Sequence, residues 1–264
     1  VEAAASNHRR IVVDACCPLV TKVHHEMKVR ARKGYTVLYV GHEGHEEAIG
    51  TMAVAPGAAR LVETAEDIEA AAAAVPAGTP VALLAQTTLP HGEWSGLVDL
   101  ARRRFPDMWM PGRSDLCYAT TNRQAAMRAL APGCDTVVVV GSENSSNTLA
   151  LAKVASQGCP QVIRVNSPDE LPEDLSGVVG VTAGASAPEW LVSEILDRLA
   201  PAGGVEIVHV TDEDEYFPPP PELRDLLRST AAALDMMLGA GSLETSPMAS
   251  DRSVRAADVL QPTV

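Results

Sequence analysis

The stretch that decides the fold is TVVVVGSENSSNTLALAKVAS, residues 136–156. Its four consecutive valines form an apolar run that is typical of a strand buried on both faces of a sheet. Gly141 ends this run, and five small neutral hydrogen-bonding side chains occupy the next six positions before a helical pattern begins. The stretch therefore predicts a buried strand, a polar turn and a helix, which is the repeating unit of an α/β protein.

The same alternation of short apolar runs and helical patterns extends over most of the chain. Strands are expected at residues 11–13, 36–41, 80–89, 136–140, 160–165, 178–184 and 205–210. Helices are expected at residues 19–34, 65–75, 94–105, 118–130, 147–156 and 186–199. Ser186, three residues before Glu189, is expected to form a capping box in the last of these helices. A further Met- and Ala-rich helix is expected after the proline-rich segment FPPPPELR.

Continuous Val-rich strands between helices indicate parallel sheets that are covered by helices on both faces. We therefore expect an α/β fold of two consecutive parallel-sheet units, followed by a C-terminal tail. A break near residues 106–115 places the first unit at residues 1–110 and the second at residues 111–202. Residues 203–264 are expected to hold the last strand, the proline-rich segment and the tail.

The composition limits the possible partners. The chain has 264 residues, a formal net charge of −13 and 46% hydrophobic residues. This acidic balance argues against nucleic acid or an anionic membrane as a partner, because both bind clustered Lys and Arg. No apolar run reaches the roughly 18 residues of a membrane span, and no secretory signal is visible. The odd number of cysteines, five, favours a reducing, cytoplasmic location.

Polar residues collect where four of the expected strands end. GHEGHEEAIGTM follows Val40, QTTL follows Ala85, GSENSSN follows Val140 and TAGAS follows Val181. Ligands of open parallel sheets bind at such points, and helix N-termini with hydroxyl and amide groups suit a phosphate or diphosphate. A single loop of this kind is more often a helix cap. Four of them at one sheet edge favour a shared anion site.

The first of these loops holds two histidines beside two carboxylates, with His42 and His45 on either side of Gly44, and Glu46 and Glu47 following. Zinc is one interpretation, but the glycines make a turn and the H-E-x-x-H pattern of zinc proteases is absent. A histidine beside a carboxylate suits proton transfer to a bound substrate better. A solvated polar loop is the remaining alternative.

Cys17 and Cys117 each stand where a helix is expected to begin. A helix N-terminus favours the thiolate form of cysteine, which binds metals. The alternative is that each is a small buried residue. Because the chain has no C-x-x-C pattern, spacing alone does not identify a cluster site.

Taken together and in order, six motifs resemble the LytB/IspH family of 4-hydroxy-3-methylbut-2-enyl diphosphate reductases. They are DACCPLVTKVHHEM, GHEGHEEAIGTM, AQTTL, DLCYATTNRQ, VVVVGSENSSN and GVTAGASAPEWLV, and the resemblance runs from about Val12 to Arg224. It implies an iron–sulfur oxidoreductase with three α/β units around a [4Fe–4S] cluster. It also implies the last step of the non-mevalonate isoprenoid pathway, with isopentenyl and dimethylallyl diphosphate as products. An electron donor such as ferredoxin or flavodoxin is implied as a partner.

The resemblance also implies roles for individual residues. Cys17 and Cys117 match two of the three cysteines that hold the cluster, and Glu47 matches the acidic proton donor. The residues that match substrate-binding positions are His45, Thr87, Ser145, Ser146, Asn147 and Ser186, the last four forming the diphosphate cradle. We expect these side chains to face one cavity together with the two cysteines.

The sequence departs from the family pattern in two places. Cys16 stands where the family has a threonine. The family's N-terminal unit, with its first cysteine ligand and two further substrate histidines, has no counterpart here, so we expect the sequence to be partial. Cys134 and Cys159 precede expected strands and belong to the wrong edge of the sheet to replace that ligand. We therefore expect this chain alone to be inactive.

Two other classes of function stay open from the sequence. One is a non-catalytic α/β module that binds diphosphate without a cluster. The other is an unrelated two-domain α/β protein that binds a sugar or a nucleotide. That class would give no reason for two cysteines and several polar loops to gather at one edge.

Overall fold

The computed structural model describes residues 14, 16–212, 217 and 219–238. By its internal contacts the chain divides into one compact unit, residues 19–212, and a second unit of residues 1–18 and 213–264. The first unit contains both parallel sheets. The second contains helix α9 (Pro221–Leu238), the predicted Met- and Ala-rich helix. It begins earlier than predicted, because residues 221–224 of the expected polyproline segment already belong to the helix.

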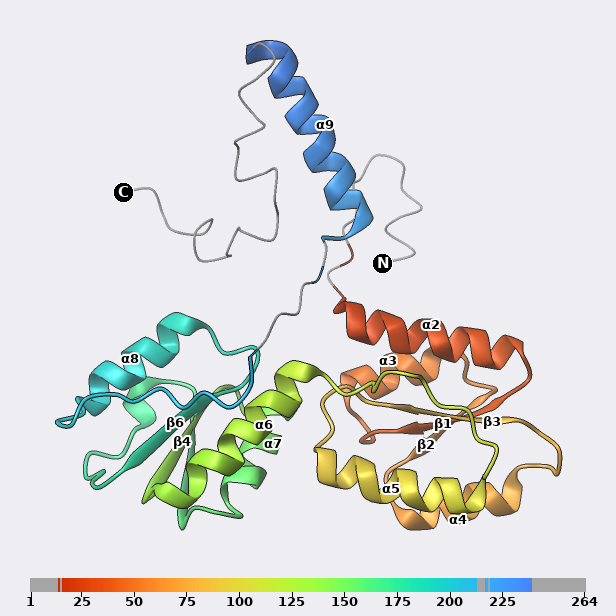
Figure 1. Cartoon of the computed structure of the whole chain (residues 1–264), viewed down its shortest axis with the longest axis horizontal. Helices are drawn as coiled ribbons and strands as arrows, with labels where there is room; N and C mark the ends of the chain where they lie inside the picture. The colour runs from red at the N-terminus through yellow and green to blue at the C-terminus, as the bar shows by residue number, and fades with distance from the viewer. Residues whose placement is uncertain (1–13, 15, 213–216, 218, 239–264) are drawn as a thin grey trace. The chain divides into compact units, whose positions relative to one another are not determined.

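The first sheet has three parallel strands in the order β2-β1-β3. Its strands are β1 (Thr36–Val40), β2 (Ala59–Val62) and β3 (Val81–Ala85). Helices α2 (Pro18–Arg32) and α3 (Glu46–Val54) pack on one face, and α4 (Ala65–Ala74) and α5 (His91–Arg104) pack on the other (Figure 1).

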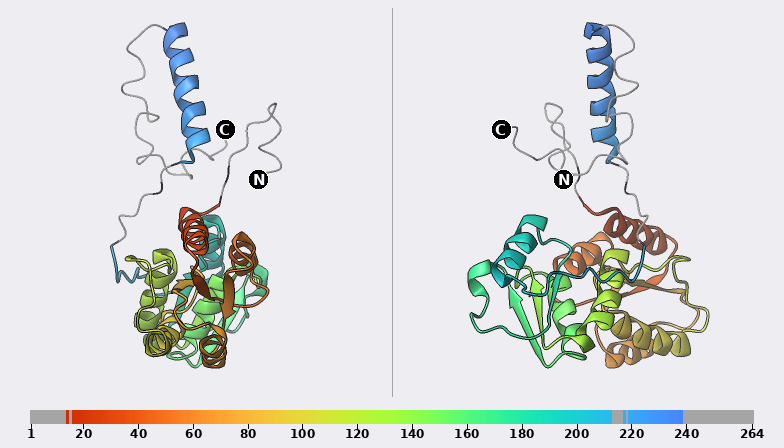
Figure 2. Two further views of the ribbon diagram at one scale, coloured as in Figure 1. Left: turned by 90° about the vertical axis from the view of Figure 1, so that its right-hand side faces the viewer. Right: turned by 60° about the vertical axis from the view of Figure 1, so that its left-hand side comes forward.

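The second sheet repeats this plan with the order β5-β4-β6. Its strands are β4 (Thr136–Val140), β5 (Gln161–Val165) and β6 (Val179–Ala183). Helices α6 (Tyr118–Leu130) and α7 (Ser146–Ala155) cover one face, and α8 (Glu189–Leu199) covers the other. Two short 3₁₀ helices, η1 (Ala131–Gly133) and η2 (Pro168–Glu170), lie in the connections. The turned views show the strands of each sheet between its helices (Figure 2).

Strand β4 shows why a run of valines specifies a central strand. Val137 and Val139 pack against α6 and α7, whereas Val138 and Val140 pack against α8. All four are fully buried, because successive side chains of a strand point to opposite faces and here both faces are covered. Burying one such side chain stabilises the fold by roughly 1.5–3 kcal/mol.

The α/β class and its two parallel sheets confirm the prediction from the sequence. Each predicted helix is present, and so are the predicted strands within residues 36–184. The bounds of α6 and β4 are as predicted, whereas the other elements begin or end a few residues away from the predicted positions. The strand predicted at residues 11–13 lies outside the described residues. Helix α3 and strand β2 were not predicted, because the first follows the polar loop directly and the second has only four residues.

Two local predictions are wrong. Residues 205–210 form no strand, and Val205 and Ile207 are exposed, because a strand pattern needs a partner strand and none of the described strands pairs with it. Ser186 does not cap α8, which begins at Glu189 after Pro188 in the N-cap position. The residue before a proline is biased away from the helical conformation, so the helix cannot extend back to Ser186.

The segment that connects the two sheets, residues 105–117, pairs with the first sheet through Trp109. Trp109 pairs with β3, donating from its backbone N–H to Val81 O and accepting from Leu83 N–H, both at 2.9 Å. The chain thus runs along the first sheet before it reaches α6. Among the described helices, none is both long enough and apolar enough to cross a membrane.

Candidate functional site

Both sheets have the strand order that creates a binding crevice. In each sheet the first strand is central, and the next two strands flank it on opposite sides. Ligands of such sheets bind where the connections leave the central strand in opposite directions, beyond the carboxyl ends of the strands. These points fall after β1 and β3 in the first sheet and after β4 and β6 in the second. All four predicted polar loops begin there.

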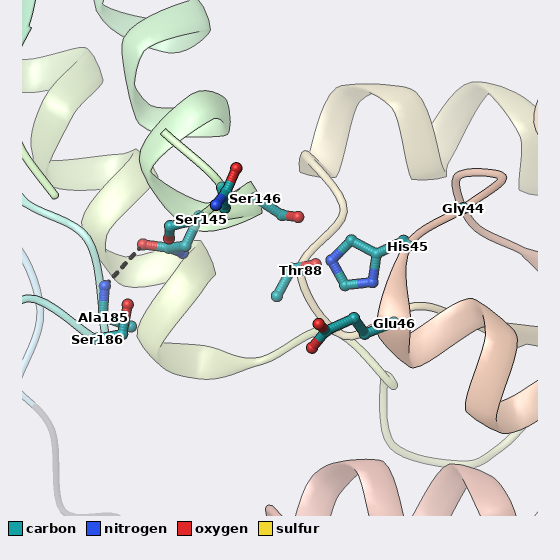
Figure 3. A pocket seen from close by; sticks show the side chains of 10 residues that line it. Gly44, His45, Glu46, Thr88, Ser145, Ser146, Ala185 and Ser186 are labelled. Atoms are coloured by element: carbon teal, nitrogen blue, oxygen red, sulfur yellow. Dashed lines mark hydrogen bonds between the residues drawn. The ribbon is translucent and has the colours of Figure 1, made fainter. Parts of the chain in front are cut away.

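A cavity of about 350 Å³ lies among these loops (Figure 3). It is lined by Gly44, His45, Glu46, Thr88, Asn144, Ser145, Ser146, Asn147, Ala185 and Ser186. The structure thus brings together five of the residues predicted to bind substrate. Glu47 and Thr87 are adjacent in sequence to lining residues but do not line the cavity themselves. The lining residues carry hydroxyl, amide and imidazole groups, with a single carboxylate from Glu46.

Ser145 and Asn147 both have structural partners. Ser145 is the N-cap of α7, and its Oγ accepts from the Thr148 N–H at 3.3 Å. The buried Asn147 donates from Nδ2 to Thr120 Oγ1 at 2.9 Å and accepts at Oδ1 from the Ala185 N–H at 3.0 Å. Asn147 therefore ties α7 to α6 and to the loop after β6, which fixes the shape of this wall of the cavity.

Two glycines let these loops approach α7 closely. A Cβ atom at Gly141 or at Gly184 would come within 2.4 Å of Thr148 Oγ1. Gly141 also has φ +144°, a conformation that L side chains rarely adopt. The glycines of GSENSSN and TAGAS are thus required because the ends of β4 and β6 pack directly on the first turn of α7.

Glu47 is a half-buried carboxylate in the first turn of α3. The Thr87 N–H donates to Oε1 at 2.8 Å, and the Thr87 hydroxyl donates to Oε2 at 2.9 Å. Burial raises the pKa of Glu47, and the hydrogen bonds from Thr87 offset only part of that rise. A carboxyl group with a raised pKa is suited to giving up a proton near neutral pH.

His45 is the N-cap of α3, and its Nδ1 accepts from the Glu47 N–H at 3.1 Å. Burial, together with the neighbouring His42, lowers the pKa of His45. Because Nδ1 accepts a hydrogen bond, the neutral ring carries its hydrogen on Nε2. The ring reaches into the cavity, where Nε2 can donate to a ligand (Figure 3).

Gln86 and Thr88 are site residues that sequence reasoning missed. The fully buried Gln86 accepts from the His42 N–H at 3.0 Å and donates from Nε2 to Thr88 Oγ1 at 2.7 Å. It therefore joins the loops after β1 and β3 and orients Thr88 in the cavity wall. The polar run QTTL directly after an apolar strand was the available signal, but it did not show which of its members reaches the cavity.

Cys117 is the N-cap of α6, and its partly exposed thiol makes no capping hydrogen bond. Its backbone N–H donates to Thr87 O at 2.7 Å, so the thiol stands beside the end of β3. The loop before it is held by buried Asp115, which pairs with Lys22 at 3.1 Å and accepts from the Ala85 N–H at 3.2 Å. Burial raises the pKa of Asp115 despite the opposing effect of Lys22.

The other cysteines lie elsewhere. Cys17 is exposed, immediately before α2, and belongs to the second unit, so its place in a common cavity stays a prediction. Cys134 and Cys159 are buried beside the first residues of β4 and β5, at the edge of the sheet opposite the cavity. Within the part of the chain that the structure describes, no three His, Cys, Asp or Glu side chains gather closely enough to hold a metal ion.

These features define a class: a doubly wound α/β protein with a polar anion-type pocket at the carboxyl ends of two parallel sheets. Within that class, the chain belongs to the LytB protein family, whose sequence profile matches residues 1–200. It is homologous to iron–sulfur oxidoreductases of the non-mevalonate pathway.

Individual relatives agree with this assignment. The chain is 43% identical over 229 residues to the "4-hydroxy-3-methylbut-2-enyl diphosphate reductase 2" of Mycobacterium bovis, covering 85% of this chain and 69% of that protein. It is 43% identical over 219 residues to the reductase 2 of Rhodopseudomonas palustris, covering 80% and 68%. A solved structure of the Plasmodium falciparum E-1-hydroxy-2-methyl-but-2-enyl-4-diphosphate reductase superposes with TM-score 0.78 at 26% identity, covering 87% and 74%.

Proposed function

We propose that the chain acts in the reduction of (E)-4-hydroxy-3-methylbut-2-enyl diphosphate to isopentenyl and dimethylallyl diphosphate. The reaction takes up two electrons and two protons and releases the hydroxyl group as water. The observation that carries the proposal is the pairing of a pocket lined mainly by neutral hydrogen-bond donors with the half-buried carboxyl group of Glu47 at the same sheet edge. The names of the similar reductases supply the substrate.

The cavity suits the diphosphate end of such a substrate. The N-termini of α3 and α7 open toward it, and helix N-termini attract anions through their free N–H groups and their dipoles. Ser145, Ser146 and Ser186 add hydroxyl donors, and His45 can donate from Nε2. Neutral donors of this kind can hold an anion even though the chain as a whole is acidic.

Glu47 would supply the proton that converts the leaving hydroxyl group into water. The Thr87 N–H can only donate, so a proton on neutral Glu47 sits on Oε2, where the Thr87 hydroxyl can accept it. Thr87 thereby fixes both the orientation of the carboxyl group and the oxygen that carries the proton.

The cysteine chemistry fits an iron–sulfur cluster in part. Cys117, whose thiol makes no capping hydrogen bond at the N-terminus of α6, is a suitable thiolate ligand, and Cys17 immediately precedes α2. Electrons and a Lewis-acidic iron are what a [4Fe–4S] cluster supplies when it is bound. A reduced ferredoxin or flavodoxin is the electron donor that we propose.

The test is an anaerobic assay of the chain after treatment with iron and sulfide, with a reduced viologen as electron donor. Consumption of substrate, accounted for by the two product diphosphates in mass spectrometry, would support the proposal and would contradict the expectation that residues 1–264 alone are inactive. The Glu47→Gln variant should retain diphosphate binding and lose turnover by a factor on the order of 10² to 10⁴. Diphosphate binding without cluster loading or turnover would instead support a non-catalytic binding module.

A further inference from the structure

Tyr39 is a buried tyrosine whose hydroxyl group lies close to Glu47, the proposed proton donor. It is the penultimate residue of β1, and its neighbours Leu38 and Val40 are aliphatic. Its side chain points to the face covered by α2 and α3 and is fully buried. A buried phenol hydroxyl needs a polar partner, so its position at the end of a central strand calls for an explanation.

The backbone beyond the strand makes room for this ring. A Cβ atom at Gly41 would lie only 2.8 Å from Tyr39 Cε1, which is closer than real Cβ contacts. The glycine that opens the GHEGHEE loop therefore allows the tyrosine ring to pack against the turn that leads to Glu47.

The hydroxyl group of Tyr39 reaches Glu47. Its oxygen is 3.5 Å from Glu47 Oε1, the same oxygen that accepts from the Thr87 N–H at 2.8 Å. The distance of 3.5 Å is at the long end of a hydrogen bond. Hydrogen bonds of catalytic groups are often long without substrate and tighten in the reacting complex.

We propose that Tyr39 is a positioning residue for Glu47. Its hydroxyl group and the Thr87 N–H together occupy Oε1, which keeps the transferable proton on Oε2 and holds the carboxyl group in one orientation. The proposal rests on the proposed role of Glu47 as a proton donor and adds a residue to that same site.

The charged groups around Glu47 set the direction of the expected effect. Buried Asp115 raises the pKa of Glu47, and Lys22 partly neutralises Asp115. His45 faces Glu47 from the start of α3 through its hydrogen bond to the Glu47 N–H. Burial and the Glu47 carboxylate raise the pKa of Tyr39, so its hydroxyl group remains a donor. Removing this donor destabilises ionised Glu47 and raises the pKa of Glu47 further.

The experiment compares Tyr39→Phe with Tyr35→Phe in the full chain. Tyr35 is a suitable control because it packs in the same apolar cluster and its ring faces Arg30. First, the pKa of Glu47 is measured in each variant without cluster or substrate, by NMR of ¹³C-labelled glutamate, with Glu47→Gln to assign the signal. We expect Tyr39→Phe to raise this pKa and Tyr35→Phe to leave it unchanged.

Second, turnover of the cluster-loaded enzyme is followed against pH. Activity of a general acid falls as the pH rises through its pKa, so Tyr39→Phe should move this alkaline limb to higher pH. On the low-pH plateau, kcat should fall roughly two- to tenfold, because one hydrogen bond that orients the acid is lost. Tyr35→Phe should match the wild type in both respects.

The outcomes separate the two proposals. An unchanged Glu47 pKa in Tyr39→Phe overturns the role of Tyr39, whether or not the enzyme turns over. A raised pKa in a cluster-loaded chain without turnover upholds the contact and overturns the proposed function. If Tyr39→Phe fails to fold, incorporation of 3-fluorotyrosine keeps the buried ring and makes the hydroxyl group a stronger donor, so it should lower the pKa of Glu47, and an unchanged pKa overturns the role of Tyr39.

Discussion

The protonation state of Glu47 is expected to change the free energy of unfolding with pH. Burial raises the pKa of its carboxyl group, so the folded chain binds this proton more tightly than the unfolded chain does. The stabilisation from that proton is complete below the ordinary glutamate pKa. It is lost as the pH rises through the raised value in the folded state.

Glu47→Gln should therefore be more stable than the wild type at neutral pH. Glutamine mimics the protonated acid, because its oxygen can accept from the Thr87 N–H and its amide can donate to the Thr87 hydroxyl group. The advantage in melting temperature should disappear as the pH falls below about 4, where the wild-type carboxyl group is itself protonated. Thermal unfolding from pH 3 to pH 8 measures it, and a pH-independent difference would contradict the buried-acid interpretation.

Glu46 is the one lining side chain that works against an anion. Its carboxylate reaches into the same cavity as His45 and faces the side of the serine cradle (Figure 3). Glu46→Gln should bind inorganic diphosphate roughly two- to threefold more tightly at physiological salt, because a screened like charge is removed. The gain should shrink in high salt. Exposed Glu43, which does not line the cavity, provides a control through Glu43→Gln, and calorimetry measures both.

At the scale of an element, the first turn of α7 has two functions that must be separated. Ser145 caps the helix and also lines the cavity, so Ser145→Ala should cost about 1 kcal/mol of stability and weaken diphosphate binding. Ser145→Asp separates these effects. Aspartate caps a helix as well as serine and favours the helix dipole, but it repels the ligand.

The expected result for Ser145→Asp is a melting temperature near that of the wild type with strongly reduced affinity for diphosphate. Chemical denaturation and calorimetry on Ser145→Ala and Ser145→Asp give the two quantities. Unchanged affinity in both variants would mean that Ser145 only caps the helix.

The elements also show how far the sequence could predict this molecule. Strand β4 and the glycine after it were evident because a run of valines, a turn and a helix are all local signals. The capping box predicted at Ser186 is absent, because Pro188 is the N-cap and α8 begins only at Glu189. The prediction of a strand at residues 205–210 was wrong, because strand pairing depends on segments far away in the chain.

For the candidate site, the sequence predicted which residues stand at strand ends but not the contacts between different elements. The sequence placed His45, Ser145, Ser146, Asn147 and Ser186 at strand ends, and the structure brings all five to one cavity. It could not reveal that Asn147 bridges Thr120 and Ala185, or that Tyr39 reaches Glu47. Such contacts join residues from different elements, so no local spacing encodes them.

At the scale of the whole molecule, the two edges of the sheets divide the cysteines into two groups. Cys117 stands at the carboxyl edge, held by its hydrogen bond to Thr87 O. Cys134 and Cys159 lie at the opposite edge of the second sheet, across the five residues of β4, which span roughly 17 Å. Burial raises the pKa of Cys134, so its thiol resists ionisation. These differences predict which thiols can serve as iron ligands.

Iron content after anaerobic treatment with iron and sulfide should therefore not depend on Cys134 or Cys159. Cys117→Ser and Cys17→Ser should each lose most of the bound iron, because each removes a proposed thiolate ligand. Cys134→Ala and Cys159→Ala should keep the wild-type iron content, since their thiols lie in the core on the far side of the sheet. Iron analysis with absorption or EPR spectra measures this, and circular dichroism checks that each variant is folded. Loss of iron in Cys134→Ala or Cys159→Ala, with the fold intact, would place the cluster at the wrong edge for the cavity and contradict the proposed site.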